Sequence, residues 1–165
     1  MKLGAIAACV MLLCCSHPDA DADDGAPIMR FDTTVVRLVT GRDTLVIHAE
    51  VARTAEQRTM GLMERRSLPD TAGMLFVWFT DQPANAGFWM YRTHIPLDIA
   101  FADASGRVVA LRQMVPCEAQ LIAGCPSYEP GHPYRFALEV NAGVLSRRKV
   151  GIGSRLLISD LFKGP

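Results

Sequence analysis

FWMYRTHIPLDIAF, residues 88–101, is the stretch around which we expect the rest of the chain to fold. It contains one of the two tryptophans, a proline that interrupts an apolar run, and a single carboxyl group, that of Asp98. Alternate side chains of a β-strand face opposite sides of a sheet. One side of this strand therefore carries the apolar residues Ile95, Leu97, Ile99 and Phe101. Asp98 stands on the opposite side, among small residues.

Other apolar segments, bounded by turn residues, are the predicted partners of this strand. Six more strands are expected at Phe31–Val39, Leu45–Val51, Gly73–Phe79, Arg107–Val115, Tyr134–Val140 and Ser154–Ser159. Thr54 opens a helix, because Gln57 completes a capping box, and this helix is expected to end at Leu68-Pro69-Asp70. Ala142–Lys149 predicts a second short helix. Without βαβ alternation, the order predicts an α+β fold: one β-rich domain with a mainly antiparallel, barrel- or sandwich-like sheet and two short helices.

The size and charge of the chain limit the classes of protein to consider. A length of 165 residues, half of them apolar, indicates one domain with a substantial core. The 17 Lys and Arg residues balance 17 Asp and Glu residues, and no dense basic run occurs. Nucleic-acid-binding proteins use such runs to contact phosphates. We therefore expect no nucleic-acid partner.

The first 28 residues have the composition of an export signal followed by a tether. Lys2 precedes an apolar segment, Leu3–Leu13, that is too short to span a bilayer but typical of a signal-peptide core. LLCC at residues 12–15 resembles a bacterial lipobox and predicts lipidation of Cys15; an ordinary secretory signal is the alternative. The expected parts are a lipoprotein-type signal peptide at 1–15, a disordered acidic tether at 16–28 and a folded domain at 29–165. The protein is thus expected to be exported and held by lipid in the membrane, on the periplasmic side of the bacterial cell envelope.

Several sequence blocks of the folded region follow one another in a familiar order. They are RTMGLM at 58–63 with Arg65, GMLF at 73–76, FWM at 88–90, IPLDI at 95–99, a cysteine loop at 116–128 and ALEVNAG at 137–143. Together they resemble the domain of unknown function 192 (DUF192) family, over about residues 48–158. The resemblance implies a small, mostly β domain with helices packed on it, often exported. It brings no established catalytic residue or cofactor, and Tyr91-Arg92 depart from the Lys-Asn common at that place.

Cys117 and Cys125 lie in a long loop, residues 116–133, of a protein that we expect to be exported. This context favours a disulfide bond between them. Closing so short a loop would stabilise the fold by about 2–3 kcal/mol on a chain-entropy model, so its main expected effect is local stiffening. The alternatives are two free thiols or a pair of cysteines that bind a metal ion, although a metal site would require closer spacing or nearby histidines.

Asp98 and Glu139 are the candidate catalytic residues. Alternation places Glu139 beside Ala137 and Asn141, on the side of its strand opposite the large apolar residues. Two carboxyls that share a pocket would raise one pKa by repulsion and partial burial, as a general acid beside a base requires. The alternative is structural: each carboxyl pairs with an arginine such as Arg65 or caps backbone amides.

An aromatic pair, Trp89 and Tyr91, lies within residues 88–101 and is typical of a surface on which a sugar stacks or a partner binds. The alternative is that Trp89 packs under the long loop. The candidate ligand-binding residues are Trp89, Asp98, Glu139, Asn141 and Arg65.

Met60 and Met63, one helical turn apart, suggest a Cu(I) site with other methionines and with His48 or His94, because thioether and imidazole suit that ion. Methionine that fills the core is the alternative, and we predict no metal site and no cofactor.

These observations favour a lipid-anchored envelope protein whose domain binds an unknown small ligand or envelope protein and catalyses no reaction. An envelope glycan hydrolase or lyase that uses Asp98 and Glu139 is the first alternative, and a periplasmic Cu(I)-binding protein is the second. The chain has no Gly-x-Ser-x-Gly elbow, phosphate loop or dinucleotide fingerprint.

Overall fold

The computed structural model describes residues 29–41 and 43–158. The predicted signal peptide, the tether and the lipidated Cys15 lie outside the described residues. Within them, the strands are β1 (Asp32–Thr40), β2 (Asp43–Ala52), β3 (Ala72–Gln82), β4 (Leu97–Ala102), β5 (Val108–Met114), β6 (Tyr134–Asn141) and β7 (Arg155–Ile158). The helices there are α1 (Ala55–Met60), α2 (Val144–Arg147) and a 3-10 turn, η1 (Ile122–Gly124). No helix in this described part is long and apolar enough to cross a membrane.

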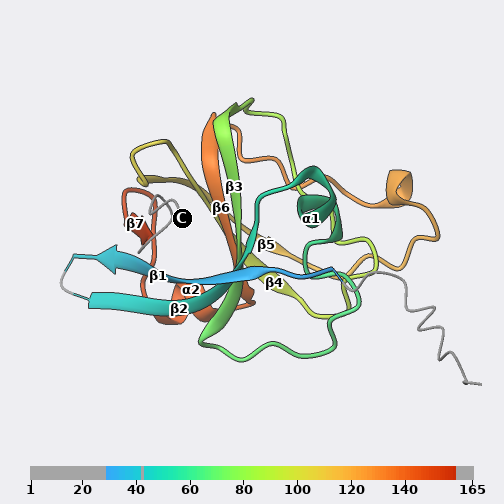
Figure 1. Cartoon of the computed structure of the whole chain (residues 1–165), viewed down its shortest axis with the longest axis horizontal. Coiled ribbons are helices and arrows are strands. Elements are labelled where there is room, and N and C mark those ends of the chain that lie inside the picture. The colour runs from blue at the N-terminus through green and yellow to red at the C-terminus, as the bar shows by residue number, and fades with distance from the viewer. Residues whose placement is uncertain (1–28, 42, 159–165) are drawn as a thin grey trace, which may run out of the picture.

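One mixed sheet holds all of these strands, in the order β5-β4-β6-β3-β2-β1-β7 (Figure 1). Neighbouring strands pair antiparallel except for β2 and β3, which are parallel. The chain crosses from β2 to β3 through α1, since a parallel pair cannot be joined by a tight hairpin. The predicted β-rich single domain with a mainly antiparallel, barrel-like sheet and two short helices is confirmed.

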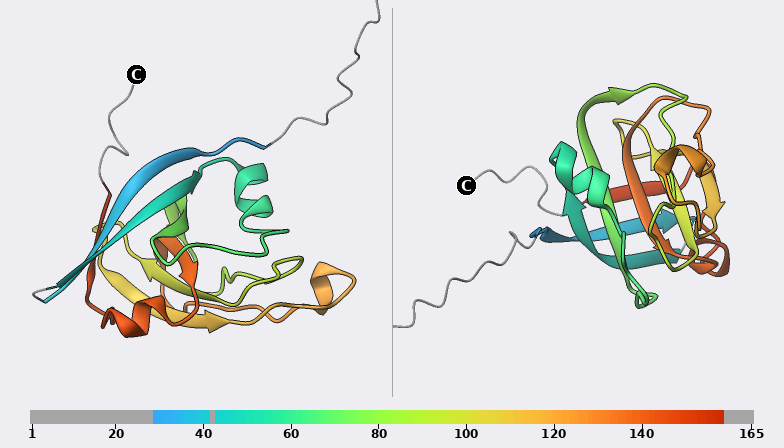
Figure 2. Two further views of the ribbon diagram at one scale, coloured as in Figure 1. Left: turned by 90° about the horizontal axis from the view of Figure 1, so that it is seen from below. Right: turned by 90° about the vertical axis from the view of Figure 1, so that its right-hand side faces the viewer.

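The sheet curls into a half-barrel, and its two edge strands meet at one end (Figure 2). Arg107 beside β5 and Arg155 of β7 form an antiparallel bridge, and the Leu156 amide donates to the Gly106 carbonyl at 2.7 Å. Gly106 has a φ of 80°, and a Cβ there would lie 2.3 Å from the Leu156 carbonyl oxygen. The closure therefore requires glycine at this position.

Each face of the sheet carries its own core. We call the core on one face the hairpin-side core, because it contains side chains of β1 and β2 together with those of α2. It includes Val36, Ile47, Ala100, Leu138, Val140 and Leu145. The other face, along β3, β6, β4 and β5, holds the loop-side core, which includes Leu62, Phe76, Met90, Ile99, Phe101 and Tyr134. Side chains alternate between the two cores along β4 and β6, which is why β4 is buried along its whole length.

Two sequence predictions differ from the structure by more than a few residues. The capping box of Thr54 and Gln57 is confirmed, but α1 ends at Met60 rather than near Leu68, because Gly61 adopts a positive φ of 49°. In the stretch at residues 88–101, regular strand begins only at Leu97. The preceding residues run as an irregular segment beside the long loop, with a bridge between Phe88 and Tyr128.

Candidate functional site

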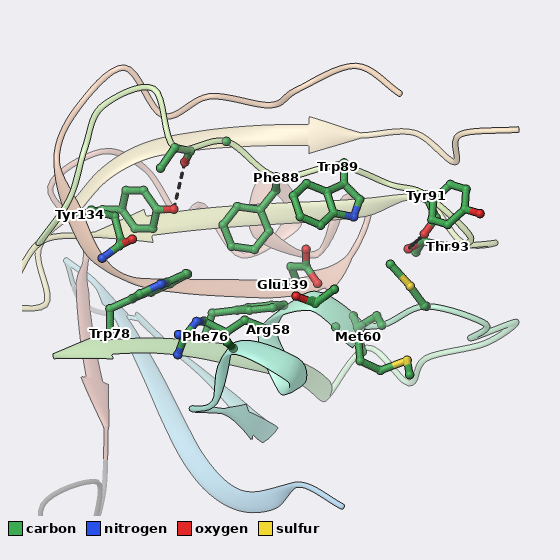
Figure 3. Close-up of a pocket in the computed structure, with 18 residues that line it drawn as sticks. Arg58, Met60, Phe76, Trp78, Phe88, Trp89, Tyr91, Thr93, Tyr134 and Glu139 are labelled. Carbon is green, nitrogen blue, oxygen red and sulfur yellow. Dashed lines mark hydrogen bonds between the residues drawn. The ribbon is translucent and has the colours of Figure 1, made fainter. Parts of the chain in front are cut away.

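A pocket of about 300 Å³ opens on the loop-side face of the sheet (Figure 3). Its walls come from three parts of the chain: α1 and the turn after it, strands β3 and β6, and the irregular segment before β4. These parts are distant in the sequence, and the crossover through α1 brings them together. The pocket is therefore a product of the tertiary fold rather than of one motif.

Aromatic rings form much of the pocket wall, and most of their contacts are edge to face. The ring centroids of Phe76 and Phe88 are 4.9 Å apart, and those of Trp78 and Tyr134 are 5.3 Å apart. Such perpendicular contacts favour one fixed arrangement of the rings. The Tyr134 hydroxyl donates to the Ala86 carbonyl at 2.9 Å, which ties β6 to the pocket rim, and desolvation raises the pKa of Tyr134 to about 12. The wall is thus apolar and held in place on several sides.

Arg58 contributes the positive charge among the residues that line the pocket. Its guanidinium lies 5.2 Å from the centre of the Trp78 ring, a cation–π distance. It also donates to the Val77 carbonyl at 3.1 Å and to the Arg53 carbonyl. Arg58 therefore fastens α1 to β3.

Glu139 lies in the middle of the pocket (Figure 3). Its strand, β6, is flanked by β3 and β4, so Glu139 is paired in register with Met74 on one side and Ile99 on the other. Only 4% of the residue is exposed, and desolvation raises the pKa of its carboxyl to about 8. Within the described part of the chain, no hydrogen bond or ion pair to this carboxyl is found, and desolvation is the one cause of its raised pKa. No fully enclosed side-chain oxygen there lacks a partner, so the Glu139 oxygens open onto the pocket. The pocket thus has at its centre a carboxyl that is protonated at neutral pH and has no protein partner.

Asp98 lies on the opposite face of the sheet. It pairs in register with Val140, whereas Ile99 pairs with Glu139, and paired residues of neighbouring strands face the same side. The Asp98 carboxyl accepts from the Leu145 amide at 3.1 Å and from the Gln113 side chain at 3.4 Å. Leu145 lies in the first turn of α2, whose amides lack partners within the helix. The expectation that Asp98 and Glu139 share one pocket is therefore wrong, and Asp98 instead caps α2.

The other predicted ligand-binding residues fall in different places. Trp89 lines the pocket and is 39% exposed. Arg65 forms an ion pair with Glu50, with nitrogen–oxygen distances of 2.6 and 2.7 Å, and it pairs with neither candidate carboxyl. The Asn141 amide donates to the Leu68 carbonyl and to Asp70 at 3.2 Å, beside a separate depression. Of the five, the structure brings only Trp89 and Glu139 to the pocket.

A disulfide joins Cys117 and Cys125, as expected, with their Cα atoms 5.7 Å apart. The backbone of Cys117 forms an isolated parallel β-bridge with that of Tyr91, and the Tyr91 hydroxyl donates to the Gln120 carbonyl at 3.2 Å. Tyr91 lines the pocket. The cross-linked loop therefore supports the rim of the pocket from outside.

The methionines of the predicted copper site are divided between the pocket and the core. Met60 and Met63 line the pocket, whereas Met74, Met90 and Met114 are buried in the loop-side core. His94 contacts Glu64 at 3.0 Å and does not line the pocket. Among the described residues, no group of three or more His, Cys, Asp or Glu is placed to hold a metal ion.

The sequence reasoning missed most of the pocket wall, including Arg58, Phe76, Trp78, Phe88 and Tyr134. One signal was present, because Phe76 and Trp78 alternate along β3 and so share a face. Alternation does not reveal whether a face is filled by neighbouring side chains or leaves a cavity.

The curled sheet with a pocket on one face defines a small β-barrel-like domain. This chain belongs to the DUF192 family, described as "Uncharacterized ACR", whose family model matches residues 36–158. The resemblance seen in the sequence is confirmed.

Solved structures with the same fold are also similar in sequence. A protein from Sinorhizobium meliloti 1021, provisionally described as a transcription regulator, is 31% identical, with 79% of this chain and 97% of that chain covered and a TM-score of 0.71. A protein of unknown function from Novosphingobium aromaticivorans DSM 12444 is 28% identical, with 80% and 89% covered and a TM-score of 0.70. No curated protein matches the chain.

Proposed function

We propose that this protein is a lipid-anchored protein of the cell envelope whose domain binds a small ligand in the pocket over Glu139. The observation that carries the proposal is a carboxyl, 4% exposed, that faces an aromatic pocket without a protein partner. Buried polar groups ordinarily have hydrogen-bond partners. An apolar pocket with one or a few such polar groups is typical of a binding site, so a ligand would complete the interactions of Glu139.

Binding without catalysis fits the chemistry of the pocket better than hydrolysis does. Glycosidases of the common kinds use two carboxyls that flank the scissile bond. Among the described residues that line the pocket, Glu139 is the one carboxyl, and no histidine or cysteine accompanies it. The register that turns Asp98 to the opposite face leaves a glycan hydrolase without its second carboxyl.

The binding proposal predicts that a small molecule copurifies with the full-length protein. Native mass spectrometry of the protein extracted from membranes should show a bound mass that is lost on denaturation. Trp89→Ala should reduce the bound fraction, because this half-exposed ring lines the pocket. Phe79→Ala is the matched control, since Phe79 is 86% exposed and does not line the pocket. A bound fraction that is equal in all three proteins would contradict binding at this site.

The anchoring proposal rests on the LLCC sequence at residues 12–15 and on the polar tether that follows it. Cys15→Ser should move the protein from the membrane fraction to the soluble periplasmic fraction and abolish incorporation of labelled fatty acid. Cys14→Ser should leave both unchanged, because serine is an ordinary residue just before the cleavage site. Fatty-acid labelling that persists in Cys15→Ser would refute this assignment.

A further inference from the structure

We propose that the ligand of this pocket is an organic primary ammonium ion with an apolar body, whose N–H groups donate to Glu139 while the body packs on the aromatic wall. The inference rests on the proposed function and deepens it by naming the class of ligand. It is carried by the arrangement of charge, hydrogen-bonding capacity and rings around Glu139.

The hydrogen-bonding capacity of Glu139 favours a donor with several N–H groups. Desolvation alone shifts the pKa of Glu139, with no hydrogen bond from a described residue contributing, and an ionised carboxyl only accepts hydrogen bonds. A primary ammonium offers three donors and carries the opposite charge. Hydrogen bonds between charged groups are also stronger than those between neutral ones. An ammonium therefore satisfies the hydrogen-bonding capacity of the Glu139 carboxyl more fully than a neutral donor does.

The rings next to Glu139 favour a cation as well. Figure 3 shows Phe88 and Trp89 on one side of the Glu139 carboxyl and Phe76 with Met60 on the other. The faces of aromatic rings attract cations, and they also accommodate apolar groups. A ligand with an ammonium head and an apolar body would thus find a favourable contact for each part.

Arg58 does not shift the preference of the pocket from a cation to an anion. Its guanidinium already stacks on Trp78 and donates to the carbonyls of Val77 and Arg53. A carboxylate ligand near Glu139 would meet a group that carries the same charge once it ionises. The described geometry therefore disfavours anions at the Glu139 end of the pocket.

A matched set of probes tests the inference on the full-length protein reconstituted in lipid nanodiscs. The probes are 2-phenylethylamine, 2-phenylethanol, 3-phenylpropanoate and the N,N,N-trimethyl derivative of the amine, measured by isothermal titration calorimetry against empty nanodiscs. The amine should bind roughly 10- to 100-fold more tightly than the alcohol. The carboxylate should not bind, and the trimethyl derivative, which has no N–H, should bind more weakly than the amine.

Variants and pH separate the role of Glu139 from general binding. Glu139→Gln should lower the affinity for the amine by roughly 10- to 100-fold and change that for the alcohol far less, because the amide oxygen still accepts from a hydroxyl. Asp98→Asn, on the other face of the sheet, is the control and should change neither. The affinity for the amine should rise roughly tenfold per pH unit between pH 6 and pH 7, as Glu139 ionises. The other titratable groups that face the pocket are Arg58 from α1, Tyr91 from the segment before β4, and Tyr134 from β6.

The outcomes distinguish this inference from the proposed function. Equal affinities for amine and alcohol, or an amine affinity unchanged by Glu139→Gln, would overturn the ammonium assignment. If the alcohol binds and Trp89→Ala abolishes that binding, the pocket is still a binding site. If no probe binds, the ammonium assignment falls, and the binding proposal is decided by the copurified molecule alone.

Discussion

The free energy of unfolding is expected to fall by roughly 4–5 kcal/mol as the pH rises from 4.5 to about 8, through the ionisation of Glu139 alone. Burial raises the pKa of this carboxyl from 4.5 to about 8 in the folded protein. Between these values the unfolded chain loses the proton while the folded protein keeps it, so the folded state binds more protons. The contribution of Glu139 to the free energy of unfolding is therefore largest below pH 4.5. It falls between pH 4.5 and about 8 and no longer changes above about pH 8.

Urea unfolding at half-unit intervals from pH 5 to pH 9 measures this effect, with Glu139→Gln as the comparison. The amide keeps the shape of the side chain and does not ionise, so this part of the slope should vanish in the variant. Other groups contribute equally to both proteins and cancel in the difference. Glu56, Glu64 and Asp103, whose pKa values are lowered by hydrogen bonds, act mainly below pH 4.5. Identical slopes in the two proteins would show that Glu139 is already ionised and satisfied in the free protein.

Asp98→Ala is expected to lower the free energy of unfolding by about 2–3 kcal/mol, because it leaves a buried amide without an acceptor. The Asp98 carboxyl, 6% exposed, accepts from the Leu145 amide in the first turn of α2. Gly143, the N-cap of that helix, has no side chain to replace it. Denaturant unfolding measures the loss, and amide hydrogen exchange at Leu145 should report faster local opening.

Asp98→Asn is the matched variant, because its amide oxygen can still accept from the Leu145 amide. The expected loss is below about 1 kcal/mol. Neither Asp98 variant should change ligand affinity, since the side chain lies on the hairpin-side face and does not line the pocket. Loss of the bound molecule in a folded Asp98→Ala protein would contradict the capping role and restore Asp98 as a candidate for the site.

The two carboxyls show how far sequence reasoning reaches in this protein. Asp98 and Glu139 were correctly placed on the sides of their strands that lack large apolar residues. Their opposite roles depend on the register of β4 and β6, because a shift of one residue would turn one side chain to the other face. No pattern within either strand specifies that register.

The sequence by itself determined the α1 capping box, the resemblance to the family and the approximate positions of most strands, because each depends on neighbouring residues or on blocks in a fixed order. It favoured the disulfide between Cys117 and Cys125 without excluding free thiols. It also indicated Glu139 and Trp89 as candidates. Only the tertiary structure decided that Asp98 caps α2, that Arg65 pairs with Glu50, and that rings from β3, β6 and residues 88–91 enclose a pocket with side chains of α1. The physical reason is that strand alternation is a local property of the chain, whereas register, closure of the half-barrel and the space left between packed elements arise from contacts between distant segments.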